Sequence, residues 1–267
     1  MPGECFKRCR LALLPICRGQ GRSNILPAHP ATITLAIVSC ITMGKKGFEL
    51  ISGMPLLNWV RFHGESGGYN VSMQFDPITP YNPTGKRTKF RFQLEGPNAV
   101  KVLDAVTQGG WPELKFFRTA TVEIAGRKVL ALCHGMGQTG GAELSGDYAD
   151  LEIVRDAILK AGETHGIRQA GTLTYFNNAI IAGWVPYPLP RIYTGEELRK
   201  YRQWLPSDSL EANMQLAGSL YSENIEDYYW TPSALGYDRF VKFNHDFVGR
   251  EALESAQRQA ASSQENA

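Results

Sequence analysis

The sequence is poor in the features that mark nucleic-acid-binding and membrane proteins. Among its 267 residues, 28 basic and 26 acidic side chains leave a formal net charge of +2, which is too small and too scattered for the concentrated basic face of a nucleic-acid-binding protein. The longest apolar run, at 31–43, is shorter than the roughly 18 residues that a membrane-spanning helix requires, and we interpret it as a strand. We therefore expect a soluble protein that acts on a small molecule, with neither a nucleic-acid nor a membrane partner.

Cysteine pairs and common catalytic motifs are missing as well. The five cysteines form no CxxC pair and have no histidine at the spacing of a zinc site, so we expect reduced thiols, a cytoplasmic location and no metal. The five histidines are scattered along the chain, and no GxSxG, phosphate-binding loop or GxGxxG pattern occurs. Hydrolase, kinase and dinucleotide-binding functions are therefore not indicated.

Composition divides the chain into four parts. Residues 1–30 imitate a signal peptide only loosely, because the apolar stretch is short and contains Pro15, and we expect an irregular lead-in. Residues 31–165 mix strand and helix signals, residues 166–254 are richer in helix signals and contain an aromatic and proline-rich loop, and the polar residues 255–267 are expected to fray. The length is sufficient for one large or two modest domains.

Side-chain periodicity predicts the elements of the first half. Between 32 and 52, two β-rich runs joined by GKKG predict a hairpin. The run FRFQLEG alternates like a half-buried strand, and the Gly-Pro pair at 96–97 then opens a helix. Three apolar residues of this helix are expected to share its buried face: Val100, Leu103 and Val106.

The following segments predict a hairpin, a strand and a second helix. The hairpin turns at 125–128, GGAELSG is a short strand, and the helix over 147–162 has Asp147 as its N-cap and Gly162 as its end. Its expected buried residues are Leu151, Val154 and Ile158. Further along, Thr194 and Glu197 have the spacing of a capping box. This order, with hairpins in place of repeated βαβ units, predicts an α+β fold in which antiparallel or mixed sheets carry helices packed on one side.

Two polar side chains stand out on the predicted strands. Glu143 lies in a glycine-rich, otherwise uncharged strand, where a carboxylate either faces water at an edge or binds a ligand in a pocket. Gln93 lies on an earlier strand, and its amide can donate and accept at once, as recognition of a ring nitrogen requires. Alternation leaves open which face of the sheet each side chain takes, so surface and pocket locations both remain.

Aromatic residues and prolines are dense between 172 and 193. Tyr175, Trp184 and further rings flank the sequence PYPLP, which cannot form regular hydrogen-bonded structure. Core packing accounts for most such clusters. Rings held by a proline-rich loop can also line the wall of a pocket, and such a wall suits a flat aromatic ligand.

Four stretches together resemble the folate-dependent aminomethyltransferase superfamily, that of the glycine cleavage T-protein: FRFQLEGPNAVKVL, GGAELSG, GTLTYFNNAIIAGWVPYPLPRIYTGEEL and NIEDYYWTPSALGYDRFVKFNHDFVGREAL. The resemblance spans residues 48–254 and is nearest to bacterial O-demethylases, which pass a methyl group from vanillate, syringate or 3-O-methylgallate to tetrahydrofolate. It implies a T-protein-like, folate-binding fold over both central parts of the chain. Tetrahydrofolate is then the cofactor, and a methoxylated aromatic acid of the kind met in lignin catabolism is the substrate.

The resemblance also implies roles for four residues. Glu143, in the position of the family's GxE strand, would bind the pterin end of tetrahydrofolate, Gln93 would lie in the same pocket, and Trp184 would pack on the cofactor. Tyr175, nine residues before Trp184 as in the O-demethylases, would be catalytic and border the methoxy substrate. A tyrosine hydroxyl, whose unperturbed pKa is about 10, can hydrogen-bond the leaving oxygen without acting as a nucleophile, and this chemistry requires no metal.

The sequence departs from the family in two respects. Family members are longer at both ends, with an N-terminal part that contributes substrate-side residues and a further C-terminal barrel, so we expect a truncated chain or a fragment. The T-protein sequence RLEAG is replaced here by AIIAG, which makes glycine cleavage less expected. The alternatives to an O-demethylase are a folate-binding relative without turnover, an aminomethyltransferase and a dimethylsulfoniopropionate demethylase, and the oligomeric state is left open.

Overall fold

The computed structural model resolves the chain into two compact units. One unit, which we call the central unit, is continuous over residues 74–185, whereas the other, the split unit, combines residues 1–73 with residues 186–267. The residues that the structure describes are 22–27, 34–43, 47–77, 82, 84–135, 139–183, 189–216, 218–236, 241–244 and 250–265.

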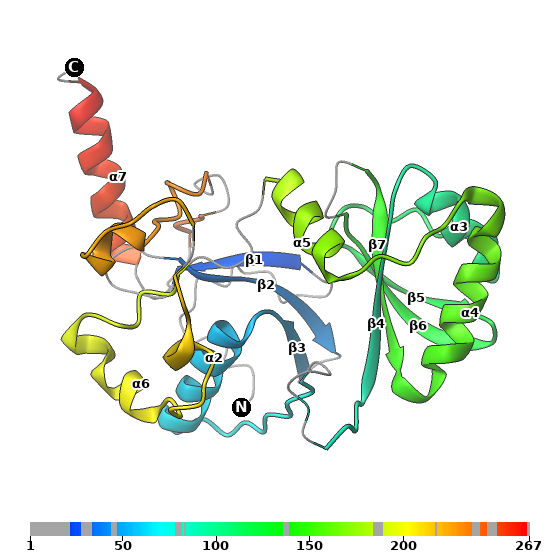
Figure 1. The fold of residues 1–267 in the computed structure, drawn as a ribbon, viewed down its shortest axis with the longest axis horizontal. Helices are drawn as coiled ribbons and strands as arrows, with labels where there is room; N and C mark the ends of the chain where they lie inside the picture. The colour runs from blue at the N-terminus through cyan, green and yellow to red at the C-terminus, as the bar shows by residue number, and fades with distance from the viewer. Residues whose placement is uncertain are drawn as a thin grey trace. The chain divides into compact units, whose positions relative to one another are not determined.

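The central unit is built on a four-stranded antiparallel sheet with the strand order β4-β7-β6-β5. Figure 1 labels its strands and α-helices. In chain order the elements are β4 (Lys89–Glu95), α3 (Ala99–Val106), β5 (Thr119–Ile124), β6 (Arg127–Cys133), β7 (Gly141–Asp147), η2 (Tyr148–Asp150), α4 (Leu151–Gly162), η3 (Glu163–His165) and α5 (Thr172–Ile181). The predicted strands and helices of this region are confirmed, and so is the α+β class.

Two local features fix the pairing of these strands. The β5–β6 hairpin turns at Ala125 and Gly126, whose φ angles of 50° and 73° are those of a type I′ turn, the turn whose twist matches a two-residue hairpin. Strand β7 begins at Gly141, where an added Cβ would collide with the carbonyl oxygen of Leu94 on β4. Only glycine therefore allows the two backbones to approach at this point.

Helices α3 and α4 cover one face of the sheet and enclose the larger core (Figure 1). The face of α3 differs from the expectation in one residue, because Val100 is 52% exposed while Val102 is 3% exposed. The stripe that faces the sheet follows the i, i+3, i+4, i+7 spacing of a helix packed on one side. Val102, Leu103 and Val106 of α3 pack in this core with Val154 and Ile158 of α4, and Ala99 of α3 is 3% exposed.

Short 3-10 turns flank the second predicted helix at both ends. Asp147 precedes the 3-10 turn η2, its side chain makes no capping hydrogen bond, and α4 itself begins at Leu151. After Gly162 the chain continues through η3 and stops at Gly166, whose φ of 72° is the left-handed conformation that terminates helices. Asp147 therefore precedes the helical segment as predicted, although its side chain forms no cap, and α4 ends at the predicted Gly162 before the 3-10 turn continues to Gly166.

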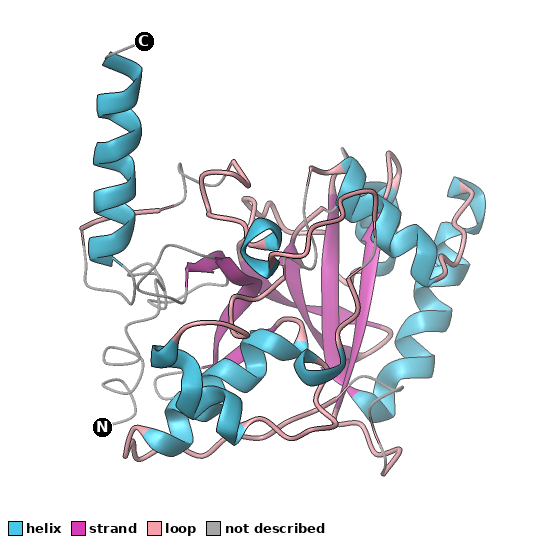
Figure 2. Ribbon diagram, turned by 60° about the vertical axis from the view of Figure 1, so that its left-hand side comes forward, coloured by secondary structure: helices cyan, strands magenta, loops and turns pink. Residues whose placement is uncertain are grey.

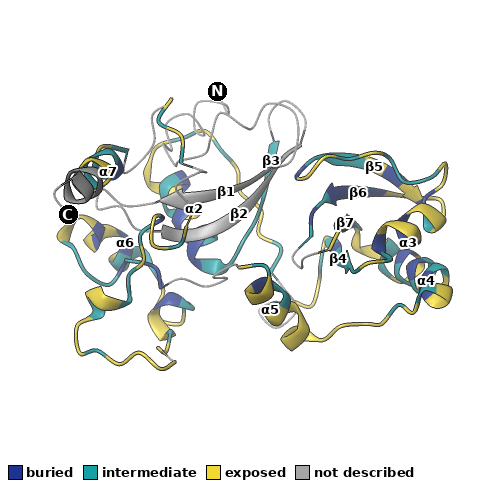
Figure 3. Cartoon of the chain, turned by 90° about the horizontal axis from the view of Figure 1, so that it is seen from above, coloured by how far each residue is buried: buried dark blue, intermediate teal, exposed yellow. Residues whose placement is uncertain are grey.

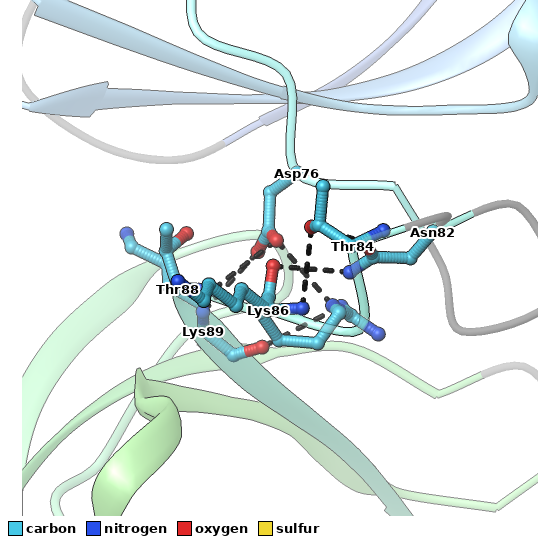
Figure 4. A network of polar contacts seen from close by, with 7 residues as sticks. Asp76, Asn82, Thr84, Lys86, Thr88 and Lys89 are labelled. Atoms are coloured by element: carbon cyan, nitrogen blue, oxygen red, sulfur yellow. Dashed lines mark hydrogen bonds and ion pairs between the residues drawn. The ribbon is translucent and has the colours of Figure 1, made fainter.

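A polar network holds the loop that leads into β4 (Figure 4). The carboxylate of Asp76 accepts hydrogen bonds from the backbone N–H groups of Thr88 and Lys89, each at 3.2 Å, and lies 3.4 Å from Nε of Arg87. Asn82 bonds to the hydroxyl and the backbone N–H of Thr84. Side chains here take the place of strand pairing, as expected for a proline-rich loop that cannot form a ladder.

The split unit contains a three-stranded antiparallel sheet of order β1-β2-β3 and several helices (Figure 2). The predicted hairpin between 32 and 52 is confirmed by the pairing of β2 with β3. The elements are β1 (Arg22–Pro27), β2 (Thr34–Met43), β3 (Gly47–Ile51), α2 (Met54–Ser66), η4 (Glu196–Leu198), α6 (Arg199–Trp204), η5 (Glu211–Asn213), η6 (Ile225–Tyr228) and α7 (Arg250–Glu265).

Helix α2 organises the core of the split unit. Its residues Leu56 and Trp59 are 0% and 4% exposed and pack against Tyr201 of α6. Ile192 and Leu198 complete the cluster. Because these partners come from residues 189–216, the core of the split unit joins segments that are distant in the sequence.

Two further details of the split unit differ from the expectations. The hydroxyl of Thr194 donates to Glu226 at 2.7 Å, and Gly195, which precedes η4, provides no side-chain cap, so the predicted capping box is not what starts this helix. Helix α7 continues to Glu265 through the segment expected to fray. Its first turn is supported by the ion pair of Arg250 with Glu254 at 2.8 Å, an i, i+4 pair of the kind that stabilises exposed helices.

Candidate functional site

Gln93 and Glu143 lie directly opposite each other on neighbouring strands of the central unit. Gln93 of β4 pairs with Glu143 of β7 in the antiparallel register, and cross-strand partners point to the same face of a sheet. Phe90 of β4, which is 2% exposed, and Leu144 of β7, which is fully buried, point to the other face, into the core under α3 and α4. The two predicted residues are thus brought together on the face that is not used by that core.

An ion pair holds the carboxylate of Glu143. Nη1 of Arg91 lies 3.3 Å from Oε1 of Glu143, and the two side chains are 26% and 17% exposed. Arg91 was missed by the sequence reasoning, although it lies two residues before Gln93 and therefore points to the same face. The low exposure of Glu143 argues against a carboxylate that simply faces bulk water, and the arginine balances its charge at that depth.

The amide of Gln93 is part of a hydrogen-bond network on the same face. Its Nε2 donates to Oε1 of Glu95 and to the backbone carbonyl of His134, both at 3.2 Å. The second oxygen of Glu95 accepts from Nδ2 of Asn178 on α5 at 3.1 Å. Helix α5 is therefore joined to the end of β4 on the face opposite to α3 and α4.

The side chain of His134 is 4% exposed, and burial lowers its pKa to about 4. The ring packs edge-on against Phe117 at 4.9 Å and lies parallel to the ring of Phe116 at 6.3 Å. An imidazole with this pKa is neutral at pH 7. His134 therefore contributes its backbone carbonyl to the Gln93 network and a neutral ring to the packing beneath it.

Tyr175, the predicted catalytic residue, lies on α5. Its side chain is 50% exposed, and its ring contacts that of Phe176 at 6.0 Å between centroids. Most of α5 is exposed (Figure 3). Asn178, which is bonded to Glu95, lies three residues after Tyr175 and so shares its side of the helix. Trp184, the fourth predicted residue, lies outside the described residues.

The described ranges show neither a metal site nor a membrane span. Among them, no group of three or more histidine, cysteine, aspartate or glutamate side chains is arranged to hold a metal ion. Of the helices that the structure describes, none is both long and apolar enough to cross a bilayer.

The split unit contains a second, deeply buried polar cluster that the sequence reasoning missed. Glu211 is 1% exposed, and its carboxylate accepts from Nδ2 of Asn58 at 2.9 and 3.1 Å and from the Tyr201 hydroxyl at 3.4 Å. Burial and the nearby Glu211 raise the pKa of Tyr193 to about 12, and the same causes raise that of Tyr201. Both phenols remain protonated donors, so this cluster ties α2 to the segment after α6.

Comparison with characterised proteins gives several relatives. The chain is 41% identical over 213 residues to a syringate O-demethylase of Sphingobium sp., and the match covers 79% of this chain and 46% of the relative. It is 31% identical over 170 residues to a sesamin methylene transferase of Sinomonas sp., covering 62% of this chain and 37% of the relative. An aminomethyltransferase of Lysinibacillus sphaericus is 38% identical over 79 residues, 29% of this chain and 22% of the relative.

The matches cover only part of each relative. The chain spans less than half the length of the curated relatives described above, since the matches cover 46%, 37% and 22% of them. No protein-family model matches the chain. The similarity therefore rests on pairwise matches. The longest of those described, to the syringate O-demethylase, covers 79% of this chain, enough to include both β4 and β7.

Proposed function

Since this chain belongs to the aminomethyltransferase superfamily and is close to its O-demethylases, we propose that it is a tetrahydrofolate-dependent methyltransferase. In this proposal it acts as an O-demethylase in the cytoplasm and moves a methyl group from a methoxylated aromatic acid of the vanillate or syringate type to tetrahydrofolate. The folate-binding part has a T-protein-like fold and includes β4 and β7. The 41% identity to a syringate O-demethylase supports the substrate class.

The observation that carries the proposal is the pairing of Gln93 with Glu143. A carboxylate accepts two N–H bonds from the amino-pyrimidinone edge of a pterin, and an adjacent amide adds a further hydrogen bond along the same edge. Arg91 keeps the carboxylate in place at 3.3 Å. The residues present fit this ligand, because a half-buried acid beside an amide supplies both the charge and the hydrogen bonds that the polar edge of a pterin needs. We propose that Trp184 packs on the flat ring.

Tetrahydrofolate supplies an amine nitrogen as the acceptor of the methyl group. In the transfer, the bond between the methyl carbon and the aryl ether oxygen would break, a carbon–nitrogen bond would form, and the phenolate that leaves would take up the proton that the alkylated nitrogen loses. We assign Tyr175 the role of stabilising that oxygen, because a tyrosine hydroxyl can donate a hydrogen bond to it. The half-exposed position of its ring on α5 leaves it accessible to a substrate.

The test is a direct assay of methyl transfer. The purified chain is incubated without oxygen with tetrahydrofolate and with vanillate, syringate or 3-O-methylgallate, and the products are separated by liquid chromatography and identified by mass. We expect 5-methyltetrahydrofolate and the corresponding phenol in equal amounts. If neither product forms with any of these methoxy acids while the protein is folded, the proposed activity is refuted.

Variants separate binding from chemistry. Glu143→Gln keeps the shape of the side chain and removes its charge, so we expect the affinity for tetrahydrofolate to fall by about 1–3 kcal/mol, the loss of a charged hydrogen-bonding partner. Tyr175→Phe removes only the hydroxyl, and we expect kcat to fall by roughly 100-fold with the folate affinity unchanged. Glu123→Gln, an exposed glutamate on β5, is the matched control for the first variant and should change neither quantity.

A second candidate is folate binding without turnover. It requires only the paired Gln93 and Glu143 on β4 and β7 and not the role proposed for Tyr175. Calorimetric titration that shows binding of tetrahydrofolate, together with no methylated product, would select this function over the O-demethylase.

A further inference from the structure

The hydrogen-bond partners of the Gln93 amide fix its orientation. Its Nε2 lies 3.2 Å from Oε1 of Glu95 and 3.2 Å from the carbonyl oxygen of His134. A carboxylate and a carbonyl can only accept, so both N–H bonds of the amide must point at them. The reversed amide would place its oxygen against two acceptors. Gln93 therefore presents Oε1, an acceptor, as the atom with which it can recognise a ligand.

Glu95 connects this amide with helix α5. Its Oε1 accepts from Gln93, and its Oε2 accepts from Nδ2 of Asn178 at 3.1 Å. Asn178 lies one turn after Tyr175 on the same side of α5. One carboxylate therefore fixes the direction of the Gln93 amide and also attaches the helix with Tyr175 to the end of β4.

We propose that Glu95 is a positioning residue that makes the site selective for a reduced pterin. This inference rests on the proposed folate site. Glu143, opposite Gln93 on β7, accepts from N3–H and the 2-amino group of the pterin. The Cβ atoms of Gln93 and Glu143 are about 5 Å apart across the strands. Gln93 therefore accepts from N8–H, a further donor along the same edge of the pterin.

The selectivity follows from what oxidation removes. In tetrahydrofolate, N8 carries a hydrogen, whereas in folic acid N8 carries a lone pair and no hydrogen. An acceptor oxygen held against that lone pair loses a hydrogen bond and is left unsatisfied. If the amide were free to rotate, it would offer its NH2 group to the oxidised ring and would bind both forms. Glu95, together with the carbonyl of His134, prevents this rotation.

The first experiment compares two ligands. Dissociation constants for tetrahydrofolate and folic acid are measured by calorimetry without oxygen for the full chain, for Glu95→Gln and for the exposed control Glu123→Gln. We expect the unmodified chain and the control to prefer tetrahydrofolate by about tenfold or more. In Glu95→Gln the new amide can donate to Oε1 of Gln93, the fixed orientation is lost, and the preference should fall to less than about threefold.

The second experiment separates the two bonds of Glu95. Asn178→Ala leaves the Gln93 amide in place, so the ratio of the two dissociation constants should stay as in the unmodified chain. Hydrogen exchange of the α5 amides should become faster, and any methyl transfer should lose kcat by roughly tenfold or more, with KM for tetrahydrofolate within about twofold, because the helix with Tyr175 is no longer held. Asn177→Ala, on the same helix and exposed, should change none of these.

The outcomes distinguish this inference from the proposed activity. Absence of methyl transfer together with a ligand preference that Glu95→Gln removes would refute the activity and support the inference. The inference is overturned if the unmodified chain binds both ligands equally or binds neither, if Glu95→Gln keeps the preference, or if Asn178→Ala removes it to the same extent. Should Glu95→Gln fail to fold, Gln93→Met takes its place. It keeps the length of the side chain without the acceptor, and an undiminished preference in it overturns the inference.

Discussion

Acidification should destabilise the central unit through His134. The imidazole is 4% exposed, and its pKa is lowered by burial from 6.5 to about 4. The unfolded chain therefore binds a proton on this side chain at a higher pH than the folded chain does. At about 1.4 kcal/mol per unit of pKa, the difference corresponds to about 3 kcal/mol.

The sign of this effect is defined by the two pKa values. Above pH 6.5 the side chain is neutral in both states and contributes no dependence on pH. Between about pH 6.5 and pH 4 the unfolded state takes up the proton first, so the free energy of unfolding falls as the pH is lowered. Below pH 4 both states are protonated and the contribution of His134 levels off.

Urea unfolding followed by far-UV circular dichroism between pH 7.5 and pH 4 measures this contribution. His134→Gln is uncharged over the whole range, and it retains the backbone carbonyl that accepts from Gln93. We expect its free energy of unfolding to depend on pH less steeply than that of the unmodified chain, by about 3 kcal/mol in total. His165→Gln is the control. Parallel pH profiles for the unmodified chain and His134→Gln would refute the reasoning.

Three further predictions concern stability. Glu211→Ala removes the acceptor of the buried Asn58 amide and should cost about 1–3 kcal/mol in urea unfolding, the effect of leaving a buried donor unsatisfied. Gly141→Ala places a Cβ against the Leu94 carbonyl and should lower the melting temperature by about 4 °C or more. Burial alone would raise the pKa of Asp76, but hydrogen bonds from backbone N–H groups and the charge of Arg87 outweigh burial, so the pKa is lowered overall. Asp76→Asn should therefore lose about 1–2 kcal/mol at pH 7, a loss that shrinks as acid protonates the unmodified carboxyl below its unfolded pKa of about 3.9.

Local pattern was sufficient to predict the strands of the central unit but not how they meet. The alternation in FRFQLEG and the short glycine-rich strand gave β4 and β7 in sequence. That Gln93 faces Glu143 depends on the register between strands 50 residues apart, since a slip of one residue would turn every side chain of one strand to the other face. Alternation places Arg91 and Glu95 on the face of Gln93, but the contact of Arg91 with Glu143 depends on this register and the contact of Glu95 with Asn178 depends on the packing of α5.

The failures at the helices have a similar origin. Val100 fits an apolar face by spacing as well as Val102 does, and only the position of the sheet decides which of them is buried. Helix α2 escaped prediction because its buried side chains, Leu56 and Trp59, sit in a short segment whose partners come from residues 189–216. Tertiary contacts with distant segments, and not helix propensity, decide such elements.

The assembly of one unit from both ends of the chain has a consequence for synthesis. Residues 74–185 can form their own core as soon as they leave the ribosome. Helix α2 is synthesised before its packing partners Ile192 and Leu198. At typical translation speeds, the time between the synthesis of α2 and that of these partners is on the order of 10 s. During this interval the apolar face of α2 lacks its native partners. Ribosome pausing between these points would leave a folded central unit next to an incomplete split unit, and chaperone binding would be most useful at that stage.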